Sequence, residues 1–427
     1  MRSFKEFISG MFCYQHFCLI IISFLAVQTV NAQEIDVLLK GGHVIDPKNN
    51  INAIMDVAVV NGKIFKVAAN IPETSAKKTL NVRGLYVSPG IIDMHVHVFQ
   101  GTDKYSTSVA NSSRSQQADA FSFRSGVTTM VDAGTSGWRN FRTFKAQSID
   151  KSKTRILAFL NVIGNGMIGR FEEQDINDMN PEMNAYMITK LFPEILVGIK
   201  SAHYWGDFTS VDKAVESGKL ANVPIMVDFG EHTPTNSIEA LFLKHFRPGD
   251  IFTHTYSEIS TGRESIVDEK TRKLKPFIFE AQKRGVIFDV GHGGGAFSWS
   301  QAIPAFRQGF MPDVISSDLH DQSMNAGMKD MTNVMSKFLA LGMQLKDVIE
   351  RSTWAPAKVI KRTDLGHLSV GADADIAVFN LREGKFGFTD VRKVSVEGSK
   401  MLEAELTLMA GKIMWDLNGI SGQAWKD

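Results

Sequence analysis

Eight short apolar runs, separated by spacers long enough for a helix, organise the middle of this 427-residue chain. Strand-length runs that alternate with helix-length spacers are typical of βα units, whose strands form a parallel sheet buried on both faces. Eight such units close into a (β/α)8 barrel. We therefore predict an α/β fold of the TIM-barrel type, with strands within 91–98, 127–133, 156–162, 195–199, 223–229, 251–255, 286–290 and 314–317.

Both ends of the chain also carry β-forming segments. Residues 35–46 and 55–64 read as short strands with Gly and Asn turns, and similar segments recur at 375–379 and 404–413. Because these segments flank the barrel in sequence, we expect both ends to assemble into one small β-sandwich.

The first 32 residues have the character of a cleavable signal peptide. Arg2 and Lys5 precede an apolar run over 17–27, and Val30-Asn31-Ala32 provides a small-residue cleavage pattern. The apolar run is too short to span a bilayer comfortably. We expect export to the periplasm or the medium after cleavage near Ala32, without stable membrane insertion of the mature chain; an uncleaved anchor is the alternative.

The predicted organisation is a leader, a composite sandwich and a barrel, with boundaries 1–32, 33–88 plus 366–427, and 89–365. A net charge of +1 provides no field that would attract nucleic acid. Both cysteines, Cys13 and Cys18, lie in the leader, so neither disulfides nor thiol chemistry are expected in the mature chain. We expect a small-molecule substrate, and the sequence leaves homo-oligomerisation open.

Polar residues follow these strands where a barrel places its active site, at the C-terminal strand ends. His95 and His97 share one face of the first strand, because side chains alternate with period two. Such a pair also arises by chance on surface strands. Here the apolar lead-in over 88–94 delivers both rings to the barrel mouth, so we predict that they reach one metal ion.

Lys200 directly follows the fourth run. Its stem starts in a buried strand, where an unpaired ammonium is strongly disfavoured. The side chain could extend to the barrel mouth or pair with a carboxylate. The more specific hypothesis is that carbon dioxide carbamylates the deprotonated amine, which gives a carboxylate able to bridge two divalent ions.

His254 in the sixth run and Asp318 after the eighth complete a set of nitrogen and oxygen ligands suited to zinc or a similar first-row ion. Taken singly, a packed core histidine and a helix-capping aspartate would explain them. Their joint position at strand ends favours the metal hypothesis.

His292 stands in the glycine-rich loop 291–295, whose backbone can approach a ligand closely. We predict that it faces the substrate or supports an oxyanion. Phosphate binding is disfavoured, because the loop lacks the lysine and spacing of a P-loop. Weaker candidates for pocket lining lie beside the predicted ligands, namely His203, Tyr204, Trp205 and His320.

These motifs resemble those of the amidohydrolase superfamily, and within it the deacetylase-like, dihydroorotase-related metallohydrolases. The resemblance covers essentially the whole mature chain and is carried by residues 89–97, 197–200, 289–293, 317–320 and 365–376. It implies that His95 and His97 hold the more buried ion and that Lys200 bridges as a carbamate. It also implies that His254 holds the more exposed ion and that Asp318 contacts metal and acts as the base.

One position departs from the family pattern. The family usually has a histidine at the end of strand five, where this chain has Asp228, with His232 four residues later. The register favours Asp228 as the replacement ligand, whereas His232 matches the usual atom type. The departure leaves metal identity and occupancy open.

Two cations in such a cluster would lower the pKa of a bridging water, deliver hydroxide near neutral pH and polarise the scissile carbonyl. Asp318 would accept the proton and return it to the departing amine or alkoxide. The leading hypothesis is therefore hydrolysis of an amide or acyl (acetyl) bond of a small molecule. Alternatives are a D-aminoacylase or dipeptidase-like enzyme, a cyclic-amide hydrolase, and an exported metal- or ligand-binding protein without catalysis; the presence of Asp318 argues against the last.

Overall fold

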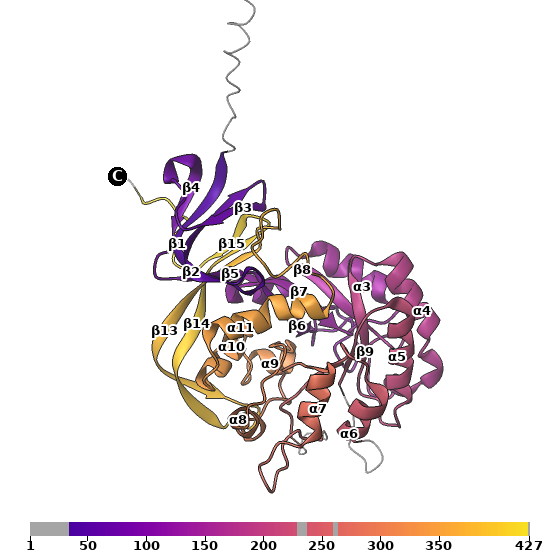
Figure 1. Ribbon diagram of the computed structural model, residues 1–427. Coiled ribbons are helices and arrows are strands. Elements are labelled where there is room, and N and C mark those ends of the chain that lie inside the picture. Colours follow the sequence, from indigo (N-terminus) through magenta and orange to yellow (C-terminus); the bar gives the residue numbers. More distant parts are fainter. Residues whose placement is uncertain (1–33, 229–236, 259–263, 426–427) are drawn as a thin grey trace, which may run out of the picture.

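The structure is a computed structural model that describes residues 34–228, 237–258 and 264–425 (Figure 1). The predicted leader, residues 1–32, and His232 lie outside the described residues. Within them the strands form two sheets, one parallel with seven strands and one with eight. In the described part of the chain, no helix combines the length and the apolar character needed to cross a membrane.

The middle of the chain forms the parallel sheet. Its spatial order follows the chain order, and every neighbouring pair is parallel. Each strand falls on one of the first seven predicted runs, although β6 and the last three are shorter than predicted. The strands are β6 (Ile91–Val96), β7 (Val127–Ala133), β8 (Arg155–Asn161), β9 (Leu196–Ser201), β10 (Ile225–Val227), β11 (Ile251–Phe252) and β12 (Ile287–Phe288).

The eighth run joins the two edges of this sheet without forming a regular strand. Val314 makes an isolated parallel bridge with Asp289, and Leu319 makes one with Val96. The backbone turns between these bridges at Asp318, whose φ of 52° lies in the left-handed region and cannot continue a strand. The segment 314–319 therefore closes the ring by pairing with both edges.

Helices connect the strands and cover the outside of the ring, as Figure 1 shows for α3, α4 and α5. In α5 the buried positions Val211, Ala214, Val215 and Gly218 recur at helical spacing, so one face packs on the sheet. The helices are α2 (Ala118–Phe121), α3 (Phe141–Gln147), α4 (Pro181–Tyr186), α5 (Thr209–Ala221), α6 (Ile238–Ala240), α7 (Phe277–Arg284), α8 (Trp299–Arg307), α9 (Asp321–Met324), α10 (Met331–Ala340), α11 (Leu345–Ser352) and α12 (Trp354–Val359). Short helical turns are η1 (Pro47–Asn49), η2 (Glu73–Ser75), η3 (Phe123–Ser125), η4 (Ile149–Lys151), η5 (Glu172–Gln174), η6 (Ile176–Asp178), η7 (Met187–Leu191) and η8 (Leu241–His245).

The two ends of the chain share the second sheet. Its order is β15-β14-β13-β5-β1-β2-β3, with β4 also paired to β1, so strands from both ends meet where β5 pairs with β13. The division into two layers of a sandwich stays a prediction, because all eight strands belong to one hydrogen-bonded sheet. The strands are β1 (Ile35–Asp46), β2 (Ile51–Val60), β3 (Lys63–Ala68), β4 (Ala76–Asn81), β5 (Tyr86–Pro89), β13 (Ile376–Thr389), β14 (Ser395–Met409) and β15 (Lys412–Asp416).

Polar contacts join the terminal sheet to the barrel. Arg155 at the start of β8 pairs with Asp373 at 2.9 Å and also with Asp375. Thr407 in β14 donates its hydroxyl to the carbonyl of Phe123 at 2.7 Å. These contacts fix the terminal sheet against the ends of the strands opposite to those that carry the predicted ligands.

Candidate metal centre

Six of the predicted ligands converge on one cavity of about 770 Å³ at the C-terminal strand ends. They come from the ends of four strands, β6, β9, β10 and β11, and from the closing segment, and all are buried. The residues are His95, His97, Lys200, Asp228, His254 and Asp318. The structure thus brings together side chains that lie more than two hundred residues apart in the sequence.

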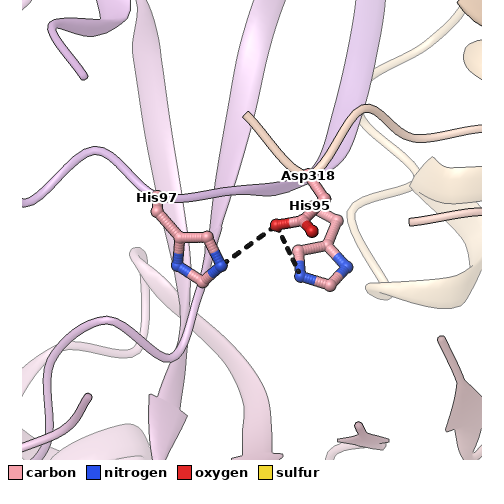
Figure 2. A group of neighbouring side chains, drawn as sticks. All are labelled: His95, His97 and Asp318. Carbon is pink, nitrogen blue, oxygen red and sulfur yellow. Dashed lines mark ion pairs between the residues drawn. The ribbon is translucent and has the colours of Figure 1, made fainter. Parts of the chain in front are cut away.

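The innermost group contains His95, His97 and Asp318, shown in Figure 2. The Nε2 atoms of His95 and His97 lie 3.5 and 3.2 Å from the same atom, Asp318 Oδ1. Among the described residues, this is the one group of three or more His, Cys, Asp or Glu side chains whose ligand atoms all lie within 4.8 Å of one another. Two ligands of a tetrahedral zinc ion, with bonds of about 2.1 Å, are separated by about 3.4 Å. The observed spacing fits an ion shared by the three side chains.

Hydrogen bonds behind the rings turn two Nε2 lone pairs toward the cavity. The Thr253 hydroxyl donates to Asp289 at 2.7 Å, so it accepts from His95 Nδ1, which is 2.9 Å away. The carbonyl of Gly291 can only accept, so it receives the Nδ1–H of His254 at 2.7 Å. Fixing Nδ1 as the donor leaves Nε2 as the ligand atom, the arrangement found behind metal-binding histidines.

The charge states of the inner group also suit a cation. Burial, together with the nearby Lys200 charge, lowers the pKa of His95 to about 3, which keeps the imidazole neutral. Burial alone would raise the pKa of Asp318, but the surrounding imidazoles, His95 and His320 first, hold it well below its ordinary value. Neutral imidazoles beside a carboxylate are the forms that bind a divalent ion.

Lys200 projects from β9 into the centre of the cluster. Its side chain is 1% exposed, and Nζ lies 3.4 Å from both His95 Nε2 and Met226 Sδ. Gly134, after β7, provides the space for its stem: a Cβ there would lie 2.4 Å from the Lys200 Cβ. The amine therefore lies buried among the predicted ligands.

Asp228 lies directly after β10 and contacts two imidazoles. Its Oδ2 is 3.3 Å from His254 Nε2 and 3.7 Å from His203 Nε2. Of the two alternatives for strand five, Asp228 therefore has its carboxylate at the cluster, whereas His232 lies outside the described residues. No sequence pattern indicated Glu173, which is fully buried and pairs with His203 Nδ1 at 3.0 Å.

The position of His292 corrects a prediction. The ring is fully buried, stacks on Phe297 with centroids 4.6 Å apart, and lies 2.5 Å from the ammonium of Lys337. Lys337 also donates to the carbonyls of Gly327 and Thr389. The ring of His292 therefore faces the buried amine of Lys337 on α10 and does not line the cavity, where the prediction placed it.

The weaker candidates divide into two groups. His320 lines the cavity, with Nε2 3.8 Å from Asp318 Oδ2, and burial lowers its pKa. His203 also lines the cavity. Tyr204 and Trp205 follow it in the same loop, and Trp205 packs edge-to-face against Phe171 at 5.6 Å. Phe171 lines the cavity, so Trp205 supports the rim of the cavity through Phe171.

Comparisons with known proteins identify the family of the chain. Residues 299–413 match the model of the amidohydrolase family. A deacetylase of Enterococcus faecalis is 30% identical over 387 residues, which cover 88% of this chain and 98% of that protein. The crystal structure of an adenine deaminase is similar with a TM-score of 0.80 at 29% identity, over 90% of this chain and 100% of that one. The crystal structure of a dihydroorotase has a TM-score of 0.76 at 29% identity, over 89% and 97%.

The chain belongs to the amidohydrolase family. It is accordingly a hydrolase that acts on non-peptide amide bonds. The resemblance that the sequence motifs indicated is confirmed.

Proposed function

We propose that this chain is a metal-dependent hydrolase that removes an acyl group, in the first place acetyl, from a small molecule by cleaving an amide or ester bond. The observation that carries the proposal is the convergence of six ligand-type side chains on one cavity, with imidazole nitrogens oriented from behind. The likeness to the deacetylase supports the acyl group as the part removed.

The proposed centre holds two divalent cations, with zinc as the first candidate. Bound there, such ions acidify water and polarise a carbonyl. His95 and His97 hold the inner ion together with Asp318, and Asp228 and His254 contribute to the outer one. Asp318 Oδ accepts the proton of the attacking water and returns it to the departing amine or alkoxide. His320, beside Asp318, faces the same space.

Lys200 takes part as a carbamate in this proposal. The neutral amine attacks carbon dioxide, a new N–C bond forms, and one proton leaves, so the product is a carboxylate on the lysine nitrogen. The buried position of Nζ among ligands supports this modification, because a plain ammonium beside His95 Nε2 would repel cations. The modified chain would be heavier by the mass of one carbon dioxide, which intact-protein mass spectrometry in bicarbonate buffer detects.

Hydrolysis of a cyclic amide is the second candidate, supported by the likeness to a dihydroorotase. Both reactions would use the same centre and differ only in whether the two products stay joined. Export through the predicted leader, with a small molecule outside the cytoplasm as substrate, also stays part of the proposal.

A substrate panel tests the proposal. The purified chain, with its metal content measured, is offered N-acetylated and O-acetylated small molecules and cyclic amides. We expect turnover of at least one acetylated compound, loss of turnover after chelation, and recovery with zinc. Turnover of cyclic amides alone would replace the first candidate by the second, and turnover that survives complete chelation would overturn the metal mechanism.

A further inference from the structure

The departure at strand five leaves the outer side of the centre short of one imidazole. Asp228 supplies oxygen at the position where the family resemblance implies a nitrogen ligand. The described structure places another imidazole at the same carboxylate: His203 Nε2 lies 3.7 Å from Asp228 Oδ2, and His254 Nε2 lies 3.3 Å from it. Ligand atoms on one tetrahedral ion stand about 3.4 Å apart. Each nitrogen thus approaches the carboxylate at nearly the separation of ligands that share an ion, but the three ligand atoms do not all lie within 4.8 Å of one another as those of the inner group do.

A buried carboxylate orients the His203 ring. Nδ1 faces both oxygens of Glu173, at 3.0 and 3.3 Å, so Nδ1–H is the donor and Nε2 carries the lone pair. Hydrogen bonds of Nδ1 orient His95 and His254 toward the cavity in the same way. Glu173 is fully buried, and burial raises its pKa, while His203 lowers it. Burying a carboxylate here is costly unless a hydrogen-bonded partner offsets the loss of water.

The surrounding loop fixes the backbone of His203 as well. His203 stands two residues beyond β9 with a φ of 57°, a left-handed conformation that is uncommon for residues other than glycine. Gln174, next to Glu173 in η5, donates to the carbonyl of His203 at 2.8 Å and accepts from the backbone N–H of Trp205 at 2.9 Å. Two adjacent residues of η5 therefore hold the ring and the main chain, which is the support expected for a functional side chain.

We propose that His203 is a ligand of the outer cation through Nε2, that it supplies the nitrogen which strand five lacks, and that Glu173 orients it. The inference rests on the two-cation centre of the proposed function. His203 would complete a set with Asp228 and His254, and the ligand shift from strand five to the loop after strand four would distinguish this chain from the usual family pattern.

Metal binding in matched variants tests the assignment. The variants are His203→Ala and Glu173→Gln. The controls are His245→Ala and Asp212→Asn, because these residues form an imidazole–carboxylate pair of 2.6 Å that does not line the cavity. Zinc per chain is measured by elemental analysis, affinity by competition with a chromophoric chelator, and the ligand set by the visible spectrum of the cobalt-substituted protein.

We expect two ions per chain in the unaltered protein and in both controls. His203→Ala should keep the inner ion, bind the outer one about 100-fold more weakly and lose part of the cobalt spectrum. Glu173→Gln should weaken the outer ion by about 10- to 100-fold with a smaller spectral change, as outer partners of metal ligands do. If His203→Ala does not fold, His203→Asn is measured in the same way, since it retains a polar side chain in a position that is 28% exposed.

An outer ion bound with unaltered affinity and spectrum in the His203 variants would overturn the assignment, and so would a single ion per chain in the unaltered protein. The proposed function fails separately. If two ions bind, the outer one depends on His203, and no panel substrate is hydrolysed, the proposed function alone is overturned. If the protein hydrolyses a panel substrate with two ions whose binding does not depend on His203, this inference alone is overturned.

Discussion

Asp318, the proposed proton acceptor, lies beside two imidazoles, is ionised, and points into the cavity. It lies 3.2 Å from the His97 ring and 3.8 Å from the His320 ring, and its pKa stays well below the ordinary value. It therefore remains ionised at neutral pH, the form that binds a cation; because a lowered pKa makes it a weaker base, its proposed role as proton acceptor requires water that bound cations have acidified. Its left-handed backbone turns the carboxylate into the cavity at the point where the closing segment leaves the sheet.

Replacement of this carboxylate should harm catalysis more than metal binding. In Asp318→Asn the amide can still contact an ion but cannot accept a proton, so we expect kcat to fall by about 10²- to 10⁴-fold. At least one ion per chain should remain, because the imidazoles are unchanged. Steady-state kinetics and elemental analysis measure both quantities. Asp321→Asn, at the neighbouring partly exposed carboxylate, is the control; metal loss in proportion to activity would contradict the prediction.

Asp93 should make stability depend on pH. Burial raises its pKa to about 7, although hydrogen bonds from Ser317 lower it. The folded chain then holds this proton more tightly than the unfolded chain, so the free energy of unfolding should fall as pH rises from about 4 to about 7. The full effect is at most about 4 kcal/mol, at 1.36 kcal/mol per pKa unit.

Denaturant unfolding of the metal-free protein across that pH range measures the effect. Asp93→Asn cannot titrate, so its unfolding free energy should lack this slope. An equal slope in both proteins would show that other groups cause the dependence.

At the residue scale, the sequence predicted the members of the centre that stand directly at strand ends. His95, His97 and Asp318 follow from the two-residue alternation and from the barrel rule. Glu173 could not be predicted, because its loop has no periodic pattern and only the folded chain brings it to His203. His292 was misplaced, because a glycine-rich loop does not determine the direction of its side chain.

Three strands, β6, β10 and β11, end just before a predicted ligand, whereas His95 lies within β6 and Lys200 within β9. β11 ends at Phe252, two residues before His254, whose φ is 59°. A left-handed residue breaks the pairing, which explains why β11 is shorter than the predicted run and why the eighth run is irregular. Apolar runs predict where a strand passes, but not where a functional side chain forces the backbone out of it. By contrast β7, which carries no ligand, has the predicted bounds.

The loop after β7 should be sensitive to a single methyl group. Gly134 has a φ of 80°, and a Cβ there would lie 2.4 and 2.6 Å from the Cβ and Cγ of Lys200. Gly134→Ala combines backbone strain with overpacking, so we expect a loss of about 2–4 kcal/mol in unfolding free energy and weaker metal binding. Gly84→Ala is the matched control, since φ is 81° but nothing lies within 4 Å. It should cost only about 1 kcal/mol; equal losses in both variants would contradict the crowding argument.

At the scale of the molecule, the barrel and the terminal sheet share polar and apolar contacts. Lys337 on α10 donates to the carbonyl of Thr389 at the end of β13, and β14 bonds to Ser336 of the same helix. Figure 1 shows α10 beside the β13–β14 hairpin. The sequence predicted that both chain ends share one β unit. It could not predict how that unit attaches, because attachment depends on single pairs such as Arg155 with Asp375.

Arg155 should stabilise both parts together. Arg155→Ala leaves two carboxylates, of Asp373 and Asp375, without this partner at a mostly buried contact, so we expect a loss of about 3 kcal/mol. Arg382→Ala, which breaks an exposed pair with Glu403, is the control and should cost less than about 1 kcal/mol. Thermal and denaturant unfolding measure both. Equal losses, or a terminal sheet that melts separately from the barrel in the unaltered protein, would contradict the prediction.

The segment 314–319 has one further consequence. The stretch that closes the ring between its first and last strands also carries Asp318, the carboxylate proposed to accept the proton. A chain in which the segment 314–319 has not yet docked would lack both the closed barrel and the carboxylate of Asp318 in the cavity. Partly folded chains should therefore have no activity. The specific activity of a preparation should then be proportional to the fraction of its chains that have finished folding.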